Sequence, residues 1–429
     1  MHEHTHRFRR PVATVASLGL IGALAACGGG GGGGDAASSP GVTKDTIVVG
    51  THQPLTGPAA AGYSSISPAT KAYFDYVNSK GGVHGRKITY KVKDDGYNPA
   101  NTQKVVRELV LKDKVFAIVN GLGTPTHTGV LDFLKTNKVP DLFVASGSRN
   151  WNQVKKYPTT FGFQADYTTE AKVQATYIKA NLAGKKVCFL GQDDDFGRDA
   201  LLGLTQVLGE DGVAERQKYV TSNTNVAPQI GKLKSAGCEV VSLATVPGFT
   251  ALAVGTAARL KFQPQWISTS VGADLNTVGG ALGKAAPLLE GFLSSNYLPS
   301  AFDAEDPWVK QFKKINAEFN DDAPFTGNTV YGMTVGYLFV QALQQNGKDL
   351  TRESLMETVE KGGLDGSGLG KLRYAKDDHA GYGGVRMAKV TGTSQDYFGP
   401  TYSTDDGDTP VEEYTEEPTQ PPADGIPTE

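Results

Sequence analysis

Residues 115–150, VFAIVNGLGTPTHTGVLDFLKTNKVPDLFVASGSRN, decide how the rest of this chain is interpreted. The run VFAIV at 115–119 is apolar and has the length of a buried strand, and PDLFVAS at 140–146 has the same character. Between them, residues 128–137 carry apolar side chains at helical spacing. The stretch therefore predicts a strand, a loop, a helix and a second strand parallel to the first.

Each predicted strand in this stretch is followed by a polar loop. The first loop supplies Thr124 and Thr126, and the second supplies Ser146 and Ser148. The carboxyl ends of parallel strands share one edge of a sheet, which is where open α/β folds bind ligands. Small hydroxyls and free backbone N–H groups at that edge predict a receptor for a small anionic group. Such residues are also common in plain turns, so a structural role for Thr124 and Ser148 stays open.

The same alternation of strand and helix runs through most of the chain. Before the stretch it predicts strands at 47–50 and 87–93 and helices at 68–80 and 101–112. The plan then repeats with strands at 186–190, 215–220, 240–245 and 264–268 and helices between them. The expected fold class is α/β, with two doubly wound, Rossmann-like lobes that face each other across a ligand cleft.

The segments beyond residue 290 are expected to connect and close the two lobes. Residues 290–298 predict an extended crossover, and residues 307–320 and 328–346 predict helices. Residues 371–374 and 385–390 are expected to form late strands. A chain that crosses between lobes more than once forms a multi-strand hinge, and such hinges suit closure around a ligand.

Both ends of the chain differ in composition from the body. Three arginines precede a short apolar run at 12–26, which predicts a signal peptide. That run ends in Leu-Ala-Ala-Cys, which resembles a bacterial lipobox and implies cleavage before Cys27 and lipidation of its thiol. Residues 27–43, with seven consecutive glycines, are expected to form a flexible tether. Residues 403–429 hold nine acidic residues, five prolines and no Lys or Arg, so a disordered, solvated tail is predicted.

Two cysteines remain after Cys27. Cys188 opens the predicted strand at 186–190, and Cys238 immediately precedes the strand at 240–245. If these strands are neighbours, the two sulfurs lie at the same edge of the sheet and can form a disulfide. Two buried free thiols are the alternative, and the sequence leaves both open.

Several blocks of this sequence resemble type I periplasmic binding proteins. They are IVVGTHQPLTGP, DDGYNPANTQKVVRELV, the stretch at 115–148 and DDDFGRD, in this order along the chain. The similarity is greatest to the substrate-binding family of branched-chain amino-acid ABC transporters, and it extends over roughly residues 44–400. It implies a first lobe of residues 44–163 plus about 296–360. The implied second lobe comprises residues 164–295 plus about 361–402.

The resemblance also implies which residues contact the ligand. In that family two loops of the first lobe hold the ligand carboxylate, and they match Thr124, Pro125, Thr126, Ser146, Gly147 and Ser148. An aromatic contact from the second lobe matches Tyr167, a further wall matches Thr245, and an aromatic residue near the hinge matches Tyr331. One position departs from the pattern, because Ser270 stands where amino-acid binders carry the acid that pairs with the ligand ammonium. The ligand is therefore expected to be an amino acid held differently, or a carboxylate or amide without that ammonium.

Other classes of function find weaker support. GLGTPT at 121–126 only approaches the dinucleotide fingerprint, because its third glycine position is Thr126. Asp193, Asp194 and Asp195 are more typical of a helix N-terminus than of a metal site. No histidine spacing or nucleophile motif indicates a metal or an enzyme. Without the acidic tail the chain is only mildly basic, which argues against nucleic-acid binding.

The expected function is that of a monomeric, lipid-anchored, extracytoplasmic solute-binding protein that delivers its ligand to an ABC permease. No cofactor, metal or catalytic activity is expected. A ligand-sensing subunit that signals to a membrane partner is the alternative, and the sequence does not separate the two.

Overall fold

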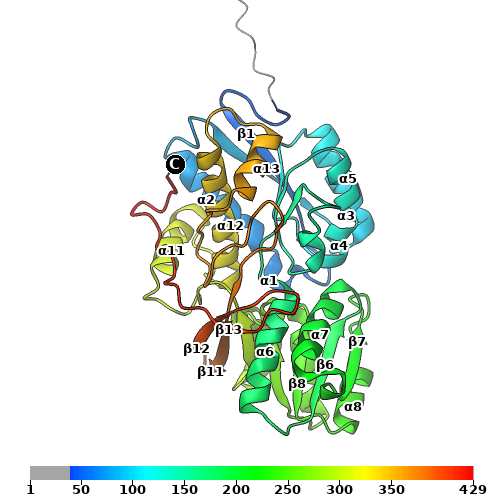
Figure 1. The fold of residues 1–429 in the computed structure, drawn as a ribbon. Coiled ribbons are helices and arrows are strands. Elements are labelled where there is room, and N and C mark those ends of the chain that lie inside the picture. Colours follow the sequence, from blue (N-terminus) through cyan, green and yellow to red (C-terminus); the bar gives the residue numbers. More distant parts are fainter. Residues whose placement is uncertain (1–38, 429) are drawn as a thin grey trace, which may run out of the picture. The chain divides into compact units, whose positions relative to one another are not determined.

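A computed structural model describes residues 39–428 (Figure 1). The predicted signal peptide, Cys27 and most of the predicted tether lie outside these residues. The described residues 39–428 belong to one compact unit. Within them, no helix is long and apolar enough to cross a membrane.

The first half of the chain builds a parallel sheet of five strands. The strands lie in the order β2-β1-β3-β4-β5, all parallel. Their bounds are β1 Thr46–Gln53, β2 Lys87–Asp94, β3 Ile118–Val119, β4 Asp141–Val144 and β5 Thr160–Gly162. The helices of this half are α1 Ala60–Tyr63, α2 Ile66–Ser79, α3 Pro99–Arg107, α4 Thr124–Thr128 and α5 Leu131–Thr136. Every residue of β3, β4 and β5 is buried, which explains the apolar runs around β3 and β4, whereas the edge strand β2 is partly exposed and alternates in polarity.

The second sheet has eight strands in the order β13-β12-β11-β10-β9-β8-β6-β7. Its parallel part comprises β6 Val187–Gln192, β7 Glu215–Tyr219, β8 Val240–Ala244, β9 Gln265–Ser268 and β10 Leu293–Asn296. Three antiparallel strands extend it, namely β11 Gly384–Thr391, β12 Ser394–Ser403 and β13 Glu412–Glu413. The helices of this half are α6 Tyr167–Asn181, α7 Asp195–Leu208, α8 Ala227–Ser235, α9 Pro247–Arg259 and α10 Leu275–Leu282. The predicted α/β fold with two doubly wound sheets is confirmed.

Three helices follow β10 and return to the first sheet. They are α11 Pro307–Phe319, α12 Gly327–Asn346 and α13 Arg352–Glu360. Helix α12 packs along α2, and every residue from 328 to 343 in it is buried. The chain then re-enters the second sheet at β11. It therefore passes between the sheets after β5, after β10 and after α13, as the predicted hinge requires.

One late strand expected from the sequence is absent from the described sheets. Residues 371–374 form only a single bridge, between Leu372 and Tyr382. The Arg373 guanidinium binds Asp378, which closes a tight turn, and the Tyr374 hydroxyl donates to the carbonyl of Gly162. These contacts bend the segment back on itself beside β5, so the prediction of a strand there is wrong. Residues 385–390, by contrast, lie in β11 as predicted.

The acidic C-terminal segment, residues 404–428, is packed against the rest of the chain, contrary to the predicted disorder. Strand β13 pairs with β12, the Trp308 indole donates to the carbonyl of Thr419, and the Tyr73 hydroxyl donates to that of Gly425. The expectation of disorder rested on charge and proline content alone. It overlooked that backbone carbonyls of an acidic segment can still be bound by donors on the body.

Cys188 and Cys238 form a disulfide, with their Cα atoms 5.8 Å apart. Cys188 lies in β6, and β8 starts two residues after Cys238. Strands β6 and β8 are direct neighbours, so the two sulfurs meet at the edge where both strands begin. Of the two alternatives that the sequence left open, the structure therefore shows the bonded one.

Candidate functional site

A pocket lies where the carboxyl ends of the parallel strands meet. It holds about 970 Å³ of empty space, counted out to its open mouth. Its wall includes eight aromatic side chains, namely Tyr63, Tyr97, Tyr167, Phe196, Tyr297, Phe302, Tyr331 and Tyr397. Polar groups complete it, including Thr124, Gln164, Ser270, Asn296 and Asn328. Asp274 is the one lining residue with an ionisable acid or base other than tyrosine, so the wall offers no Lys, Arg or His.

Three of the predicted residues bring their hydroxyls together at one side of this pocket. Thr124 Oγ1 lies 2.7 Å from Ser146 Oγ, and the Tyr167 hydroxyl donates to Ser146 Oγ at 3.2 Å. Thr124 and Tyr167 line the pocket directly, whereas Ser146 lies behind them and is buried. Burial raises the pKa of Tyr167 to about 12, against the effect of its hydrogen bonds to Ser146 and Thr124. The phenol therefore stays protonated near neutral pH and can donate a hydrogen bond.

Gly123 shapes the loop in front of these hydroxyls. Its φ of +107° lies in the region that favours glycine. A Cβ atom there would lie 2.4 Å from Thr126 Oγ1 and 2.6 Å from the Tyr97 ring. Any other residue would displace the loop, because both neighbours are buried. The glycine thus lets Thr124 begin α4 directly at the pocket wall.

Six of the ten predicted ligand contacts do not line this pocket: Pro125, Thr126, Ser146, Gly147, Ser148 and Thr245. The hydroxyl of Thr126 donates to the carbonyl of Leu122 at 2.6 Å, inside the first turn of α4. Ser148 donates to Asp199 at 3.0 Å, and the hydroxyls of Thr245 and Thr250 are hydrogen-bonded to each other at 2.6 Å. These three hydroxyls have partners in the protein and do not line the pocket, and their contact with a ligand stays a prediction.

Gly147 and Ser148 line a separate, much smaller hollow next to Asp166 and Asp406. Asp199, the partner of Ser148, also accepts from the backbone N–H of Arg149 at 3.1 Å. Burial raises the pKa of Asp199 to about 6 against these hydrogen bonds. This arrangement ties the loop after β4 to α7 of the second sheet, which is a structural task.

Ser270 lines the pocket, and a buried acid, Glu170, lies directly behind it. Glu170 of α6 accepts from the backbone N–H and from the hydroxyl of Ser270, both at 2.8 Å. The Ser295 hydroxyl donates to the same carboxyl at 2.6 Å. Burial raises the pKa of Glu170 to about 7, because its partners are neutral. Sequence reasoning missed Glu170, since it lies 100 positions from Ser270 in the sequence.

Tyr331 lines the pocket from α12. Its hydroxyl accepts from the Gln164 amide at 3.2 Å, while the Asn120 amide lies 3.5 Å away. Burial raises the pKa of Tyr331 far above its ordinary value, so the hydroxyl is always protonated. Its own proton is left for a further acceptor, such as a group bound in the pocket.

Most of the lining residues that the sequence analysis missed obey the rule that found Thr124. Tyr97 follows β2, Gln164 follows β5, and Tyr297 follows β10. Each residue comes just after a parallel strand, as Thr124 does after β3, so applying the strand-end rule to every strand would have found them. Tyr63, Phe302 and Tyr397 come from other segments, and no local signal marks them.

The acidic run 193–195 serves the start of α7. Asp194 caps the helix and accepts from the backbone N–H of Phe196 at 3.0 Å, as the capping interpretation expected. Asp195 pairs with Arg198 and accepts from the Asn150 amide. Among residues 39–428, no group of three or more acidic, His or Cys side chains is arranged to hold a metal ion.

The model of the periplasmic binding protein family matches residues 46–396, which is most of the chain. The chain belongs to this family. The match covers both sheets, from β1 into β12, and includes every strand that contributes a loop to the pocket. Several of the relatives that it matches are Leu/Ile/Val-binding proteins, the group that the sequence blocks resemble.

Two relatives illustrate the level of sequence similarity. Leu/Ile/Val-binding protein homolog 3 of Brucella melitensis is 26% identical over 205 residues, which is 46% of this chain and 53% of the relative. Leu/Ile/Val-binding protein homolog 1 of Brucella suis is 24% identical over 342 residues, which is 76% of this chain and 86% of the relative. This periplasmic binding protein spans about half the length of several other relatives that it matches.

Solved structures share the fold at lower identity. A fatty acid ABC transporter substrate-binding protein from Thermomonospora curvata has a TM-score of 0.78 at 21% identity and covers 88% of this chain and 98% of that one. A branched-chain amino acid ABC transporter protein from Thermus thermophilus, solved with bound valine, has a TM-score of 0.74 at 19% identity. It covers 85% of this chain and 98% of that one. These matches establish the fold of this periplasmic binding protein.

Proposed function

We propose that this periplasmic binding protein captures an amino acid or a related small carboxylate or amide and delivers it to an ABC importer. The observation that carries the proposal is the pocket itself, which collects side chains from the carboxyl ends of strands in both sheets. Such a site suits reversible binding by closure, because both halves of the fold contribute to it. The binding proteins among its relatives and structural neighbours support this function.

The chemistry of the pocket wall supports a ligand that is partly polar and partly apolar. An anionic group would be held by hydroxyl and amide donors such as Thr124, Tyr167 and Gln164, since the wall offers no cation. The aromatic rings would cover an apolar part of the ligand. If the ligand carries an ammonium, Asp274 is the lining residue with the charge to receive it. In our proposal, Asp274 takes the place of the acid that is missing at position 270.

A thermal-shift panel of aliphatic and aromatic amino acids, carboxylic acids, fatty acids, amides and urea tests the proposal. A solute that binds the folded state raises the melting temperature by mass action. Calorimetry with Thr124→Val should then show binding of that solute weakened by roughly 1–3 kcal/mol, since a hydrogen bond to the solute is lost. Thr136→Val, on the exposed face of α5, is the matched control. A panel with no shift, or equal affinity in both variants, would contradict the proposal.

The lipid anchor at Cys27, attachment outside the cytoplasm, the monomeric state and the ABC permease partner are parts of the same proposal. They are supported by the lipobox resemblance and by the family. A sensor subunit that signals to a membrane partner is the alternative, and the same pocket would serve it. Mass spectrometry of the protein from its host membrane tests the anchor, because cleavage and lipidation would leave a modified Cys27 as the first residue.

A further inference from the structure

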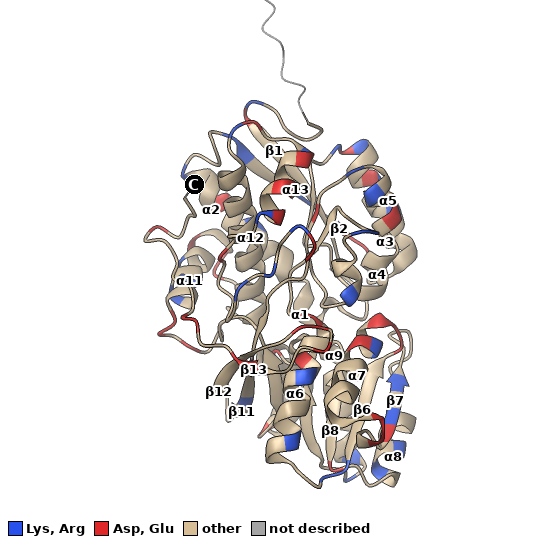
Figure 2. Cartoon of the chain, in the orientation of Figure 1, with Lys and Arg blue, Asp and Glu red and all other residues tan. Residues whose placement is uncertain are grey.

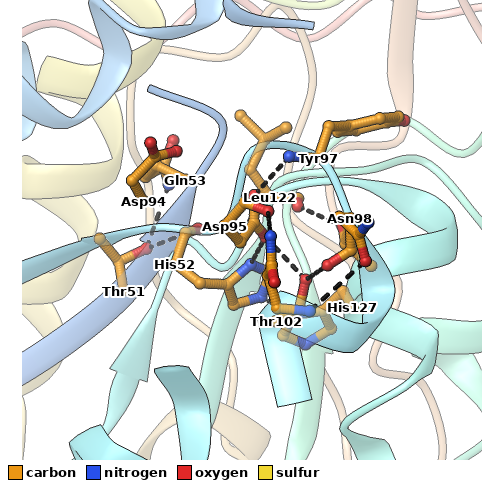
Figure 3. A network of polar contacts seen from close by, with 12 residues as sticks. Thr51, His52, Gln53, Asp94, Asp95, Tyr97, Asn98, Thr102, Leu122 and His127 are labelled. Atoms are coloured by element: carbon orange, nitrogen blue, oxygen red, sulfur yellow. Dashed lines mark hydrogen bonds and ion pairs between the residues drawn. The ribbon is translucent and has the colours of Figure 1, made fainter. Parts of the chain in front are cut away.

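Four titratable side chains form an unbroken series of contacts next to the loop at 121–127. Figure 3 shows three of them, Asp95, His52 and His127. His52 Nδ1 lies 2.8 Å from Asp95 Oδ2, and His52 Nε2 lies 2.8 Å from His127 Nδ1. The other nitrogen of His127, Nε2, lies 2.8 Å from Asp141 Oδ2. All four side chains are fully buried. The order is therefore Asp95, His52, His127, Asp141, with three hydrogen bonds between the ends.

Both carboxyl groups at the ends of this chain accept from further donors, although Asp141 Oδ1 is buried and has no hydrogen-bond partner. Asp95 accepts from the backbone N–H of Tyr97 at 2.8 Å and from the Thr102 hydroxyl at 2.9 Å. Asp141 accepts from the Thr160 hydroxyl at 2.9 Å. A carboxyl group that receives donors from several sides is stabilised in its ionised form. An ionised Asp95 needs an N–H donor from His52, and an ionised Asp141 needs one from His127.

Three hydrogen bonds between these four side chains need three protons, whereas two neutral imidazole rings carry only two. A neutral imidazole has one N–H, and the two N–H groups are both needed for the bonds to Asp95 and Asp141. The contact between His52 Nε2 and His127 Nδ1 would then join two lone pairs at 2.8 Å, which repel each other. A third proton between the rings converts that contact into a hydrogen bond. With both carboxyl groups ionised, one of the two rings is then an imidazolium.

The surroundings decide which ring carries the extra proton. Burial lowers the pKa of His52, and the nearby His127 lowers it further, while the hydrogen bond to Asp95 opposes both effects. His52 is therefore the neutral ring, with its proton on Nδ1. The third proton then belongs to His127, which is protonated at both nitrogens and paired with Asp141.

We propose that His127 is held as a buried imidazolium and that this proton positions the ligand loop at 121–127. The charged and titratable groups that face the two rings are Asp95 from the loop after β2 and Asp141 from β4. Thr102 of α3 and Thr160 of β5 add hydroxyls, and the Trp151 ring packs nearly perpendicular to the His127 ring, with 5.2 Å between their centroids. Among residues 39–428, the ionisable side chains hydrogen-bonded to either ring are Asp95, Asp141 and the other histidine.

The loop at 121–127 is in direct contact with His52 and His127. Gly121 packs so closely that a Cβ atom there would lie 2.5 Å from His127 Nδ1 and 2.7 Å from His52 Nε2. The backbone N–H of Leu122 donates to the carbonyl of His52, and that of His127 donates to the carbonyl of Gly123, both at 3.1 Å. Loss of the third proton would push the two rings apart and move this loop. Asp95 would carry the change to Tyr97, whose ring lines the pocket.

The direction of the pH effect follows from the extra proton. The hydrogen bond between the two rings exists only while the third proton is present. Its contribution to stability is therefore present at low pH and is lost once a rise in pH removes that proton. The loop position should change over the same pH range.

Nitrogen NMR of the full-length protein labelled with ¹⁵N histidine tests this proposal. At about pH 8, ordinary histidines are almost entirely neutral, so one ring with two N–H groups should stand apart. That signal should vanish in His127→Gln and remain in His84→Gln, the control. In a uniformly ¹⁵N-labelled sample, the backbone amides of Gly121 and Gly123 should shift with the same midpoint as that ring.

A folded protein at about pH 8 in which every histidine is neutral would overturn the proposal, since an ordinary histidine has lost its extra proton there. So would a doubly protonated ring that persists in His127→Gln, or loop amides that do not follow its titration. If His127→Gln does not fold, the titration of the unaltered protein decides alone. That the loop contacts a solute rests on the proposed function. The measurement uses no solute, so its failure and a failure of solute binding are distinguishable.

Discussion

Glu170 is a buried carboxyl that lies beside the pocket and has only neutral hydrogen-bond partners. Removing a carboxylate from water is costly unless a cation or several donors replace the water, and here three donors do so incompletely. The pKa of about 7 expresses that balance. Near neutral pH the group therefore exists in both protonation states, immediately behind Ser270 of the pocket wall.

At the residue scale, Glu170→Gln should change how stability depends on pH. The folded pKa of about 7 lies above the ordinary carboxyl value, so the folded state of the natural protein keeps a proton that the unfolded state has lost. The natural protein should lose stability, on the order of 3 kcal/mol, between about pH 4.5 and pH 7 relative to the Gln variant. Urea unfolding of both proteins across that range measures the difference.

The exposed Glu318→Gln substitution on α11 is the control for that experiment. It should leave the pH dependence of the natural protein unchanged. Parallel stability curves for the natural protein and Glu170→Gln would show that Glu170 does not titrate near neutral pH in the folded state.

Helix α6 anchors the C-terminal segment through a single side chain. The Lys172 ammonium donates to the carbonyls of Asp405, Gly407 and Thr409 at 2.7–3.0 Å. Its side chain is only 5% exposed, and Asp405 Oδ1 lies 3.9 Å away. A loop rich in acidic residues thus wraps its backbone around one cation. Figure 2 shows the wider setting, in which Lys and Arg are interspersed with Asp and Glu along the helices.

At the element scale, Lys172→Met should release this loop. Methionine can occupy the space of the lysine stem, but the three carbonyls lose a charged donor. Hydrogen bonds to charged groups contribute more than neutral ones, so we expect a loss of about 3 kcal/mol in the free energy of unfolding. Hydrogen exchange should accelerate in residues 404–413. Lys179→Met, at an exposed position of the same helix, should change neither quantity. Equal exchange in both variants would rule out the anchor.

Hydrogen bonds join loops of the two sheets across the pocket. The Tyr63 hydroxyl donates to the carbonyl of Val271 at 2.9 Å, and Gly327 donates its backbone N–H to Asp274 at 3.1 Å. Tyr63 precedes α2, whereas Val271 follows β9, so this bond exists only when the halves approach each other. The chain passes between the sheets several times, which provides the hinge for such an approach.

At the scale of the whole molecule, Tyr63→Phe should weaken solute binding by favouring separation of the halves. The substitution keeps the ring and removes one neutral hydrogen bond, worth about 1 kcal/mol, so the Kd of the solute found in the panel should rise about fivefold. Calorimetry measures the change. Tyr177→Phe on α6, outside the pocket, should leave the Kd unaltered. A Kd that is the same in all three proteins would show that this bond does not contribute to closure.

The local pattern of the sequence was sufficient for the fold and for part of the site. Apolar strand segments alternating with helical ones predicted both sheets, because burial on both faces demands apolar strands. The rule that ligands bind at strand ends led to Thr124, which lines the pocket. The family resemblance added Tyr167, Ser270 and Tyr331, which also line it.

Tertiary structure decided what each of those groups does. Thr126 and Ser148 look equivalent to Thr124 in sequence, yet their hydroxyls bind Leu122 and Asp199 instead of facing the pocket. A hydroxyl chooses between a ligand and a protein acceptor by direction, and local sequence does not set that direction. The same holds for contacts between distant residues, such as Glu170 with Ser270 or Lys172 with the C-terminal segment. Local propensity thus determined the elements, whereas close packing of distant segments determined which polar groups remain available to a solute.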